Sequence, residues 1–238
     1  MGPSTRSTAA GLLTLLALSL SGGASVLAQD AETPPPATPL EGMERGPLAP
    51  GTYGDDSLGP IVTFSVEEGW DLSGPPIEEV GFDLMYGDSG PAAIWVVRFD
   101  GIVFGEPCVT DGDVEAYFAD TVTLDATPEA FMQRLAENPF LTTSEPVSVI
   151  VGGAPGLQVD LTSAIGAECD PPVTFLWELP VVGEFHLNDG ENARVIALDV
   201  GGDVVVVFIE AFPGVDYPPF LEAAMSVVET MELTPAGG

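Results

Sequence analysis

Few residues in this chain are of the types that carry out covalent or acid–base chemistry. The 238-residue sequence has one histidine, His186, and two cysteines, Cys108 and Cys169. It has five arginines and no lysine, so it can form neither a Schiff base nor a lysine-containing phosphate loop. His186 could act as a general base, but no nucleophile or orienting acid stands beside it in the sequence. We predict that it has no catalytic role.

A short string, Gly87-Asp88-Ser89-Gly90-Pro91, is similar to the nucleophile motif of chymotrypsin-type serine proteases. It lacks the second glycine of that motif, and the histidine that should precede the serine is missing because His186 follows it. The G-x-S-x-G nucleophile elbow does not occur in the chain either. We therefore interpret the string as a turn.

Acidic loops are the remaining candidates for a site. Oxygen ligands for calcium could come from Asp111-Gly112-Asp113-Val114-Glu115 or from Asn188, Asp189 and Glu191, but neither group has EF-hand spacing. Zinc would need an unusual carboxylate-rich site or would have to break the cysteine pair. Among 37 acidic residues some pair will lie at a separation that suits glycoside hydrolysis, so carboxylate pairs are uninformative. We predict no catalytic residue, no metal site and no cofactor.

The net charge of −32 limits the partners of the chain. Such a field repels nucleic acid and anionic lipid, and the arginines stand singly along the sequence. We exclude binding to nucleic acid. The acidity indicates a solvated or salt-adapted surface, and the alternative is recruitment of a basic partner or divalent cations.

The first 28 residues are typical of an export signal. Arg6 supplies a weak positive charge, residues 9–20 are apolar, and a small-residue cleavage site ends at Ala28. The apolar run is shorter than the roughly 20 residues that span a bilayer. We expect cleavage after Ala28, a secreted or extracytoplasmic product and no membrane span.

In an oxidising compartment an even number of cysteines favours pairing, so we predict a disulfide between Cys108 and Cys169. A reactive thiol is the alternative. Residues 29–50 are rich in proline and small residues, which predicts a largely disordered linker. The remaining residues, 51–238, contain enough apolar side chains for one globular domain.

Strand patterns dominate this domain, and two helices are expected to cover them. The clearest unit is a β-hairpin of residues 194–200 and 203–212, whose second arm is apolar on both faces and therefore belongs in the middle of a sheet. Thr127 is placed to cap one helix, with Pro128 in its first turn. A second, amphipathic helix follows Asp216.

The order of these elements, together with specific strings, resembles the Mog1 and PsbP-like superfamily. The strings are Ser144-Glu145-Pro146-Val147, the run from Val151 to Asp160, and Leu198-Asp199-Val200-Gly201-Gly202 before the last helix. The resemblance extends over residues 51–233 and is clearest to a group of uncharacterised exported bacterial proteins. It implies an α+β fold, an α/β/α sandwich with a mainly antiparallel sheet and flanking helices. The better-known members are protein-interaction or assembly modules without catalysis.

We therefore expect an exported, non-catalytic domain that binds a protein or a cell-envelope component. A small-ligand or calcium-binding module is the second hypothesis, with a pocket between the sheet and the helices. A hydrolase with carboxylate chemistry is the third. The sequence does not indicate the partner or the oligomeric state.

Overall fold

The computed structural model describes residues 36–87, 91–110, 118–167, 169–179 and 182–237. The expected export signal and its cleavage site lie outside these ranges. The expected linker needs a correction, because the folded unit begins at Pro36 rather than at residue 51. Leu40 and Leu48 are buried at 0% and 4% exposure, so two leucines within the proline-rich segment anchor it to the core.

A nine-stranded antiparallel sheet forms the centre of the fold, in the order β10-β12-β15-β16-β7-β6-β5-β2, and β11 also pairs with β12. Its strands are β2 (Gly46–Pro47), β5 (Trp70–Leu72), β6 (Gly81–Tyr86), β7 (Ala92–Phe99), β10 (Leu141–Thr143), β11 (Val147–Val151), β12 (Ala154–Ser163), β15 (Asn192–Val200) and β16 (Asp203–Ala211). The predicted hairpin is confirmed as β15 and β16. Gly201 and Gly202 form its turn with φ values of 69° and 102°.

Among the described residues, three smaller sheets accompany the central one. Four strands pair in the order β1-β3-β4-β17, and two further pairs are β8-β9 and β13-β14. The bounds are β1 (Thr38–Pro39), β3 (Gly51–Asp55), β4 (Ile61–Val66), β8 (Ile102–Phe104), β9 (Thr121–Thr123), β13 (Val173–Leu179), β14 (Gly183–Asn188) and β17 (Glu232–Thr234).

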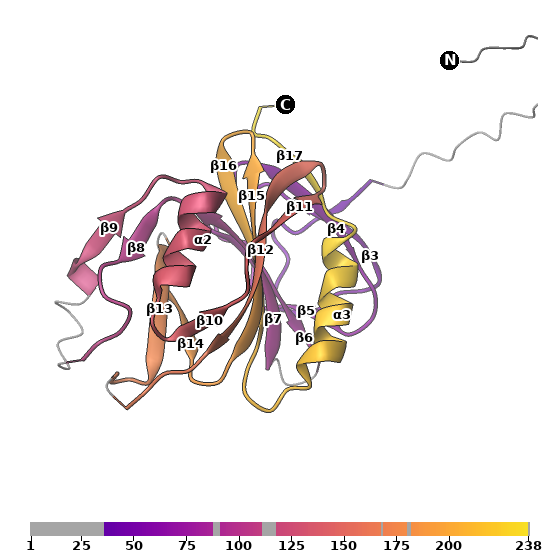
Figure 1. The fold of residues 1–238 in the computed structure, drawn as a ribbon. Helices are drawn as coiled ribbons and strands as arrows, with labels where there is room; N and C mark the ends of the chain where they lie inside the picture. The colour runs from indigo at the N-terminus through magenta and orange to yellow at the C-terminus, as the bar shows by residue number, and fades with distance from the viewer. Residues whose placement is uncertain (1–35, 88–90, 111–117, 168, 180–181, 238) are drawn as a thin grey trace, which may run out of the picture. The chain divides into compact units, whose positions relative to one another are not determined.

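Both predicted helices are confirmed, as α2 (Pro128–Glu137) and α3 (Tyr217–Val228). The Thr127 side chain caps α2 by accepting a hydrogen bond from the Ala130 N–H at 3.2 Å. Figure 1 shows the two helices on opposite sides of the central sheet.

Each face of the central sheet is covered by one helix and a small sheet. On one face, α3 and β4 pack against apolar side chains of β15 and β16. On the other face, α2 and the β13–β14 hairpin pack around Phe208 of β16. The fold is therefore the predicted α+β sandwich with a mainly antiparallel sheet, and small sheets complete the cover that two helices leave open.

Candidate functional site

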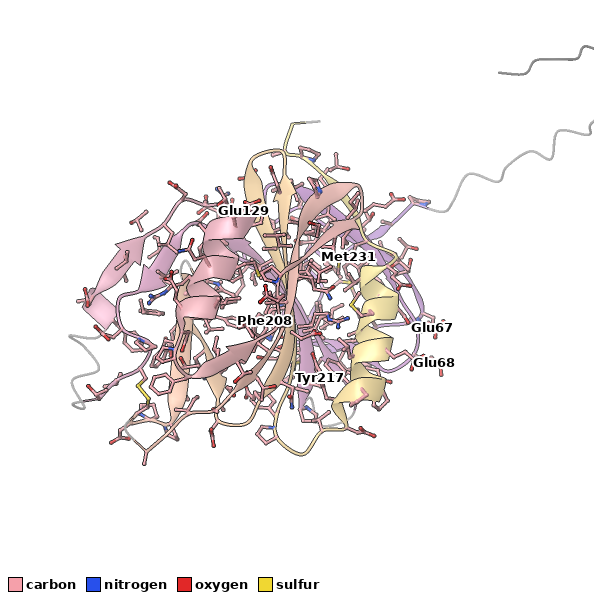
Figure 2. The ribbon with its side chains drawn as sticks, viewed as in Figure 1. Glu67, Glu68, Glu129, Phe208, Tyr217 and Met231 are labelled. Carbon is pink, nitrogen blue, oxygen red and sulfur yellow. A yellow bond between two sulfur atoms is a disulfide. The ribbon has the colours of Figure 1, made fainter. Side chains whose placement is uncertain are left out.

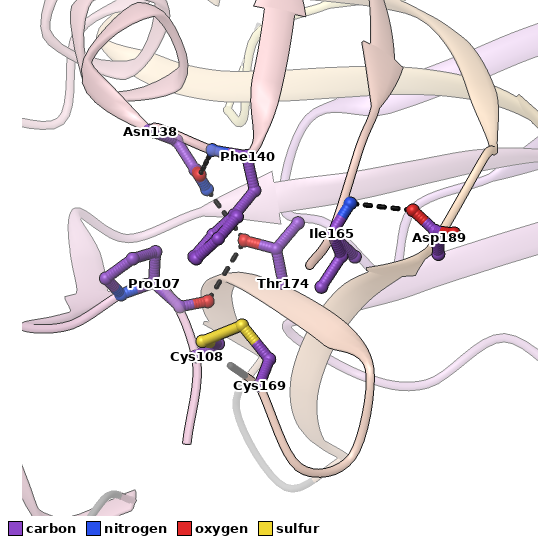
Figure 3. Close-up of a disulfide and its surroundings, with 8 residues drawn as sticks. All are labelled: Pro107, Cys108, Asn138, Phe140, Ile165, Cys169, Thr174 and Asp189. Atoms are coloured by element: carbon purple, nitrogen blue, oxygen red, sulfur yellow. Dashed lines mark hydrogen bonds between the residues drawn. A yellow bond between two sulfur atoms is a disulfide. The ribbon is translucent and has the colours of Figure 1, made fainter. Parts of the chain in front are cut away.

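The two cysteines are joined in a disulfide, which ties the segment after β8 to the segment before β13 (Figure 3). Both are buried, at 3% and 4% exposure. Beside them the Thr174 hydroxyl donates to the carbonyl of Pro107 at 3.0 Å and accepts from the Asn138 amide at 2.9 Å. A buried disulfide within a satisfied hydrogen-bond network has a structural role, and the reactive-thiol alternative has no support here.

The second candidate calcium loop, with Asn188, Asp189 and Glu191, forms hydrogen bonds within the protein. The Asn188 side-chain amide donates to Glu191 Oε1 at 2.6 Å, and Asp189 Oδ1 accepts the Ile165 N–H at 2.6 Å. These bonds fix the turn before β15. Within the described ranges, no group of three or more His, Cys, Asp or Glu residues is arranged to hold a metal ion. The loop at 111–115 and Ser89 of the protease-like string lie outside those ranges.

His186 lies on β14, half-buried, with its ring 5.8 Å from the ring of Phe175. Its Nδ1 is buried and has no hydrogen-bond partner. Burial lowers the pKa of the imidazole, and the neighbouring Glu184 carboxylate offsets part of that effect. The structure therefore places beside His186 neither an orienting acid on Nδ1 nor a nucleophile from the described residues.

The acidic surface is dispersed over the outside of the fold. Glu129 on α2 and Glu67 and Glu68 after β4 are exposed and point outward, whereas Phe208 lies within the core (Figure 2). Two arginines are engaged by acids: Arg194 pairs with Asp160 at 2.7 Å, and Arg98 with Asp100 at 2.8 Å. The surface of the described residues is thus predominantly negative.

The most exposed large apolar side chain of the described residues lies at a sheet edge, on β11. Ile150 is 77% exposed and Val147 is 56% exposed. The whole strand, with the sequence Val-Ser-Val-Ile-Val, carries no charge although the chain is highly acidic. Natural edge strands are commonly protected by charges, prolines or bulges, and β11 contains none of these in its five residues.

The turn at the end of β11 determines which backbone groups face outward. Gly152 and Gly153 both have positive φ, and Val151 pairs with Ala154 around this two-residue turn. Pairs alternate between hydrogen-bonded and non-hydrogen-bonded along an antiparallel ladder, so Ile150 and Ser148 fall at non-hydrogen-bonded positions. Ile150 lies opposite Pro155, which has no N–H, as this register requires.

The N–H and C=O groups of Ser148 and Ile150 therefore point away from β12, and within the described residues none of these groups has a protein partner. An acid lies at each end of the strand. Glu145 precedes it and is exposed, and exposed Glu232 neighbours Leu233, whose N–H bonds to Gly152 at 3.3 Å. We call this feature the β11 edge: residues 147–151 with Glu145 and Glu232 at its ends.

The sequence predicts a strand-rich domain, but local patterns do not show that residues 147–151 form an unprotected edge, because strand order is not visible in them. It also missed Glu210, a buried acid on β16 that is only 6% exposed. One signal was present: Glu210 is the only charged residue in the apolar run 204–212. A single acid in a central strand is expected to be buried, and a buried carboxyl needs a hydrogen-bond donor or an opposite charge.

No family model matches the chain, and no curated protein matches its sequence. Among the described residues, no helix is long and apolar enough to cross a membrane. Among solved structures, the chain is similar to LpqN of Mycobacterium tuberculosis, described as involved in cell envelope biogenesis. That pair is 13% identical, with 81% of this chain and 91% of that chain covered and a TM-score of 0.40.

The chain is also similar to the cyanobacterial PsbP of Synechocystis, with 9% identity, 78% of this chain and 94% of that chain covered, and a TM-score of 0.40. PsbP gives its name to the superfamily that the sequence resembles. Both likenesses are too remote to bear on function, and the fold class assigned above rests on the strand order and helices of this chain itself.

Proposed function

We propose that this chain is an extracytoplasmic, non-catalytic binding domain that takes an extended segment of a positively charged protein or envelope component along the β11 edge. The observation that carries the proposal is the exposure of an uncharged, apolar edge strand with outward-facing backbone groups at Ser148 and Ile150. Such an edge is the template for β-strand addition, in which main-chain hydrogen bonds supply affinity and alternate side chains supply specificity.

Charge selects the class of partner. The net charge of −32 attracts a basic chain and repels a second copy of this one. Glu145 and Glu232 are positioned to pair with basic side chains at the two ends of an added strand. Val149 and Val151 are half-buried and pack on the core, which holds β11 in place for pairing.

Export and the absence of catalysis are parts of the same proposal. The buried disulfide suits an oxidising compartment, and residues 1–28 have the composition of a cleavable signal that ends at Ala28. The residue types argue against catalysis, because the chain lacks lysine and its single histidine has no partner on Nδ1. Residues 29–35 then lie in the sequence between the expected cleavage site and the folded unit, which begins at Pro36.

A designed peptide tests the strand-addition step. The probe alternates valine and threonine and carries lysines at both ends, and we expect it to protect the Ser148 and Ile150 amides from hydrogen exchange. A peptide with the same core but terminal glutamates should bind at least tenfold more weakly, because its charges repel the domain. A peptide that is N-methylated on its pairing amides should not bind, because it cannot form the ladder.

Two variants provide the control. Ile150→Lys places a positive charge on the edge and should abolish binding of the lysine peptide, whereas Val122→Lys alters a residue that is 45% exposed on β9 and should leave binding unchanged. Equal binding of the N-methylated peptide, or an unaffected Ile150→Lys variant, would reject strand addition. Concentration-dependent dimerisation that Ile150→Lys removes would show that the edge pairs with a second copy instead.

A further inference from the structure

A second feature lies over the middle of the central sheet, at β16, which is two strands away from β12. A pocket of about 190 Å³ opens between the β13–β14 hairpin and the central sheet. Its polar groups come from Glu210 on β16 and from His186 and Glu184 on β14, and its aromatic walls include Trp95 and Phe185. With about 30 Å³ for each liquid water, this volume accommodates roughly six waters or a ligand of a few heavy atoms.

Glu210 forms the inner polar wall of this pocket. It is 6% exposed, and its Oε1 accepts a hydrogen bond from the Trp95 indole N–H at 2.7 Å. No described residue bonds to Oε2, so this oxygen is available to a ligand in the pocket. Glu210 lies two residues after Phe208 and therefore on the same face of β16.

Further acids face Glu210 from neighbouring strands and turns. Burial raises its pKa to about 8, and the charges of Glu191 and Asp83 add to this effect, against the Trp95 hydrogen bond that lowers it. Glu191 is itself 1% exposed, and its Oε2 has no hydrogen-bond partner. This part of the fold therefore holds a buried carboxyl proton and an excess of acceptor oxygens over donors.

The rest of the pocket suits the body of an organic cation. The rings of Trp95 and Phe185 meet edge to face at 5.4 Å, and apolar Val182 and Phe212 stand half-exposed at the pocket. Aromatic faces attract ammonium groups through the ring quadrupole. His186 also lines the pocket, and its imidazole can accept a hydrogen bond from an N–H donor when it is neutral.

We propose that this pocket binds a small primary alkylammonium group, which pairs with Glu210 Oε2 and displaces the proton of that carboxyl to solvent. The ligand keeps its positive charge, Glu210 changes from carboxylic acid to carboxylate, and one proton leaves, so charge and atoms balance. A metal ion is a poorer fit, because no group of three ligating side chains exists among the described residues. The ammonium supplies N–H donors that the cluster of acids lacks, and the acidic surface concentrates cations near the opening.

The probe is n-butylammonium, measured by isothermal titration calorimetry on the full mature chain in two buffers of different protonation enthalpy. Close to one proton should be released for each ligand bound at pH 7, about half a proton at pH 8, and almost none at pH 9.5, because Glu210 is then already ionised. Neutral n-butanol and anionic butyrate should bind at least tenfold more weakly. A capped lysine amide distinguishes a protein side chain from a free amine as the source of the group.

Glu210→Gln keeps the shape and the acceptor for Trp95 and should lose both ammonium affinity and proton release, with the fold checked by its melting curve. Glu178→Gln, a change at an exposed residue of β13 that does not line the pocket, should leave both proton release and affinity unchanged. Ile150→Lys should bind butylammonium as the parent does, so failure here and failure at the β11 edge are separate results. Equal binding of butanol, or proton release that persists in Glu210→Gln, would overturn the proposal.

Discussion

The two faces of the central sheet are built from the same strands but bury different chemistry. On the face covered by α3 and β4, the buried side chains of β16 are all aliphatic: Val205, Val207, Ile209 and Ala211. On the face covered by α2 and the β13–β14 hairpin, β16 presents Val204, Val206, Phe208 and then the acid Glu210. Packing alone does not require an acid at this position, and a buried carboxyl lowers stability relative to an apolar residue.

The covers of the two faces also differ. On the aliphatic face, the chain continues from α3 directly into β17, and β17 pairs with β4. Helix and small sheet are therefore connected on this face. The cover on the acid-bearing face is a separate two-stranded hairpin, whose approach is fixed by the disulfide at Cys169 and by a bond from the Phe175 N–H to Pro107 at 2.9 Å. Both faces pack an apolar core, but the face under the β13–β14 hairpin also holds a buried acid beside a pocket, which lowers stability.

Removing the disulfide should produce the largest loss. For a separation of 61 residues, the chain-entropy account gives a stabilisation of about 4 kcal/mol. A Cys108→Ser/Cys169→Ser variant should therefore unfold at lower urea concentration by an amount that corresponds to this value. Hydrogen exchange should increase first in β13 and β14, because the disulfide fixes the segment that leads into them.

A uniform increase in hydrogen exchange after removal of the disulfide would contradict this difference between the two faces. Equal acceleration of exchange in α3 and in β13–β14 would show that both covers depend on the disulfide. Intact mass after alkylation without reductant provides the control, because the parent chain should take up no label.

Replacing Glu210 should change stability by a smaller amount and in the opposite direction, because the variant becomes more stable than the parent at high pH. Its folded pKa of about 8 lies above the ordinary value of 4.5, so the native state holds a proton that the unfolded state releases between these pH values. The contribution of this carboxyl is fully present below pH 4.5 and is lost as pH rises through 8. Since one pKa unit corresponds to about 1.4 kcal/mol and local relaxation absorbs part of the shift, Glu210→Gln should gain roughly 2 to 3 kcal/mol at pH 9 relative to the parent.

The gain should vanish near pH 4, where both side chains are neutral. Urea unfolding at pH 4, 7 and 9 measures it, and Glu178→Gln on the exposed side of β13 provides a matched surface control. A pH-independent difference between Glu210→Gln and the parent would mean that the carboxyl is not buried in its protonated form.

Local sequence patterns predicted much of this fold and little of its candidate sites. The β15–β16 hairpin and the starts of both helices were predictable, because turn glycines, Thr127 and the apolar spacing are local signals. The anchoring of residues 36–50 was not, because Leu40 and Leu48 find their partners only when distant strands assemble. For the same reason, neither the β11 edge nor the neighbours of Glu210 can be read from adjacent residues.

The smallest expected change in stability comes from the residues that precede the two covering helices. Thr127 caps α2 through its side chain, whereas Asp216 precedes α3 and makes no side-chain capping bond. Thr127→Ala should cost about 1 kcal/mol, because the Ala130 N–H loses its acceptor. Asp216→Ala should cost only about 0.3 kcal/mol, the contribution of a negative charge near a helix N-terminus at the surface.

Paired urea titrations of the two alanine variants test this difference, with Thr127→Ser as a variant that keeps the capping oxygen and should match the parent. If Asp216→Ala costs as much as Thr127→Ala, the start of α3 depends on a bond that forms in solution, and the two helices are held alike. If only Thr127→Ala is destabilising, the helix on the acid-bearing face depends on a local cap, whereas α3 depends on the apolar packing of Phe220, Ala224 and Val227. That result would extend the contrast between the two faces from their buried side chains to the helices that cover them.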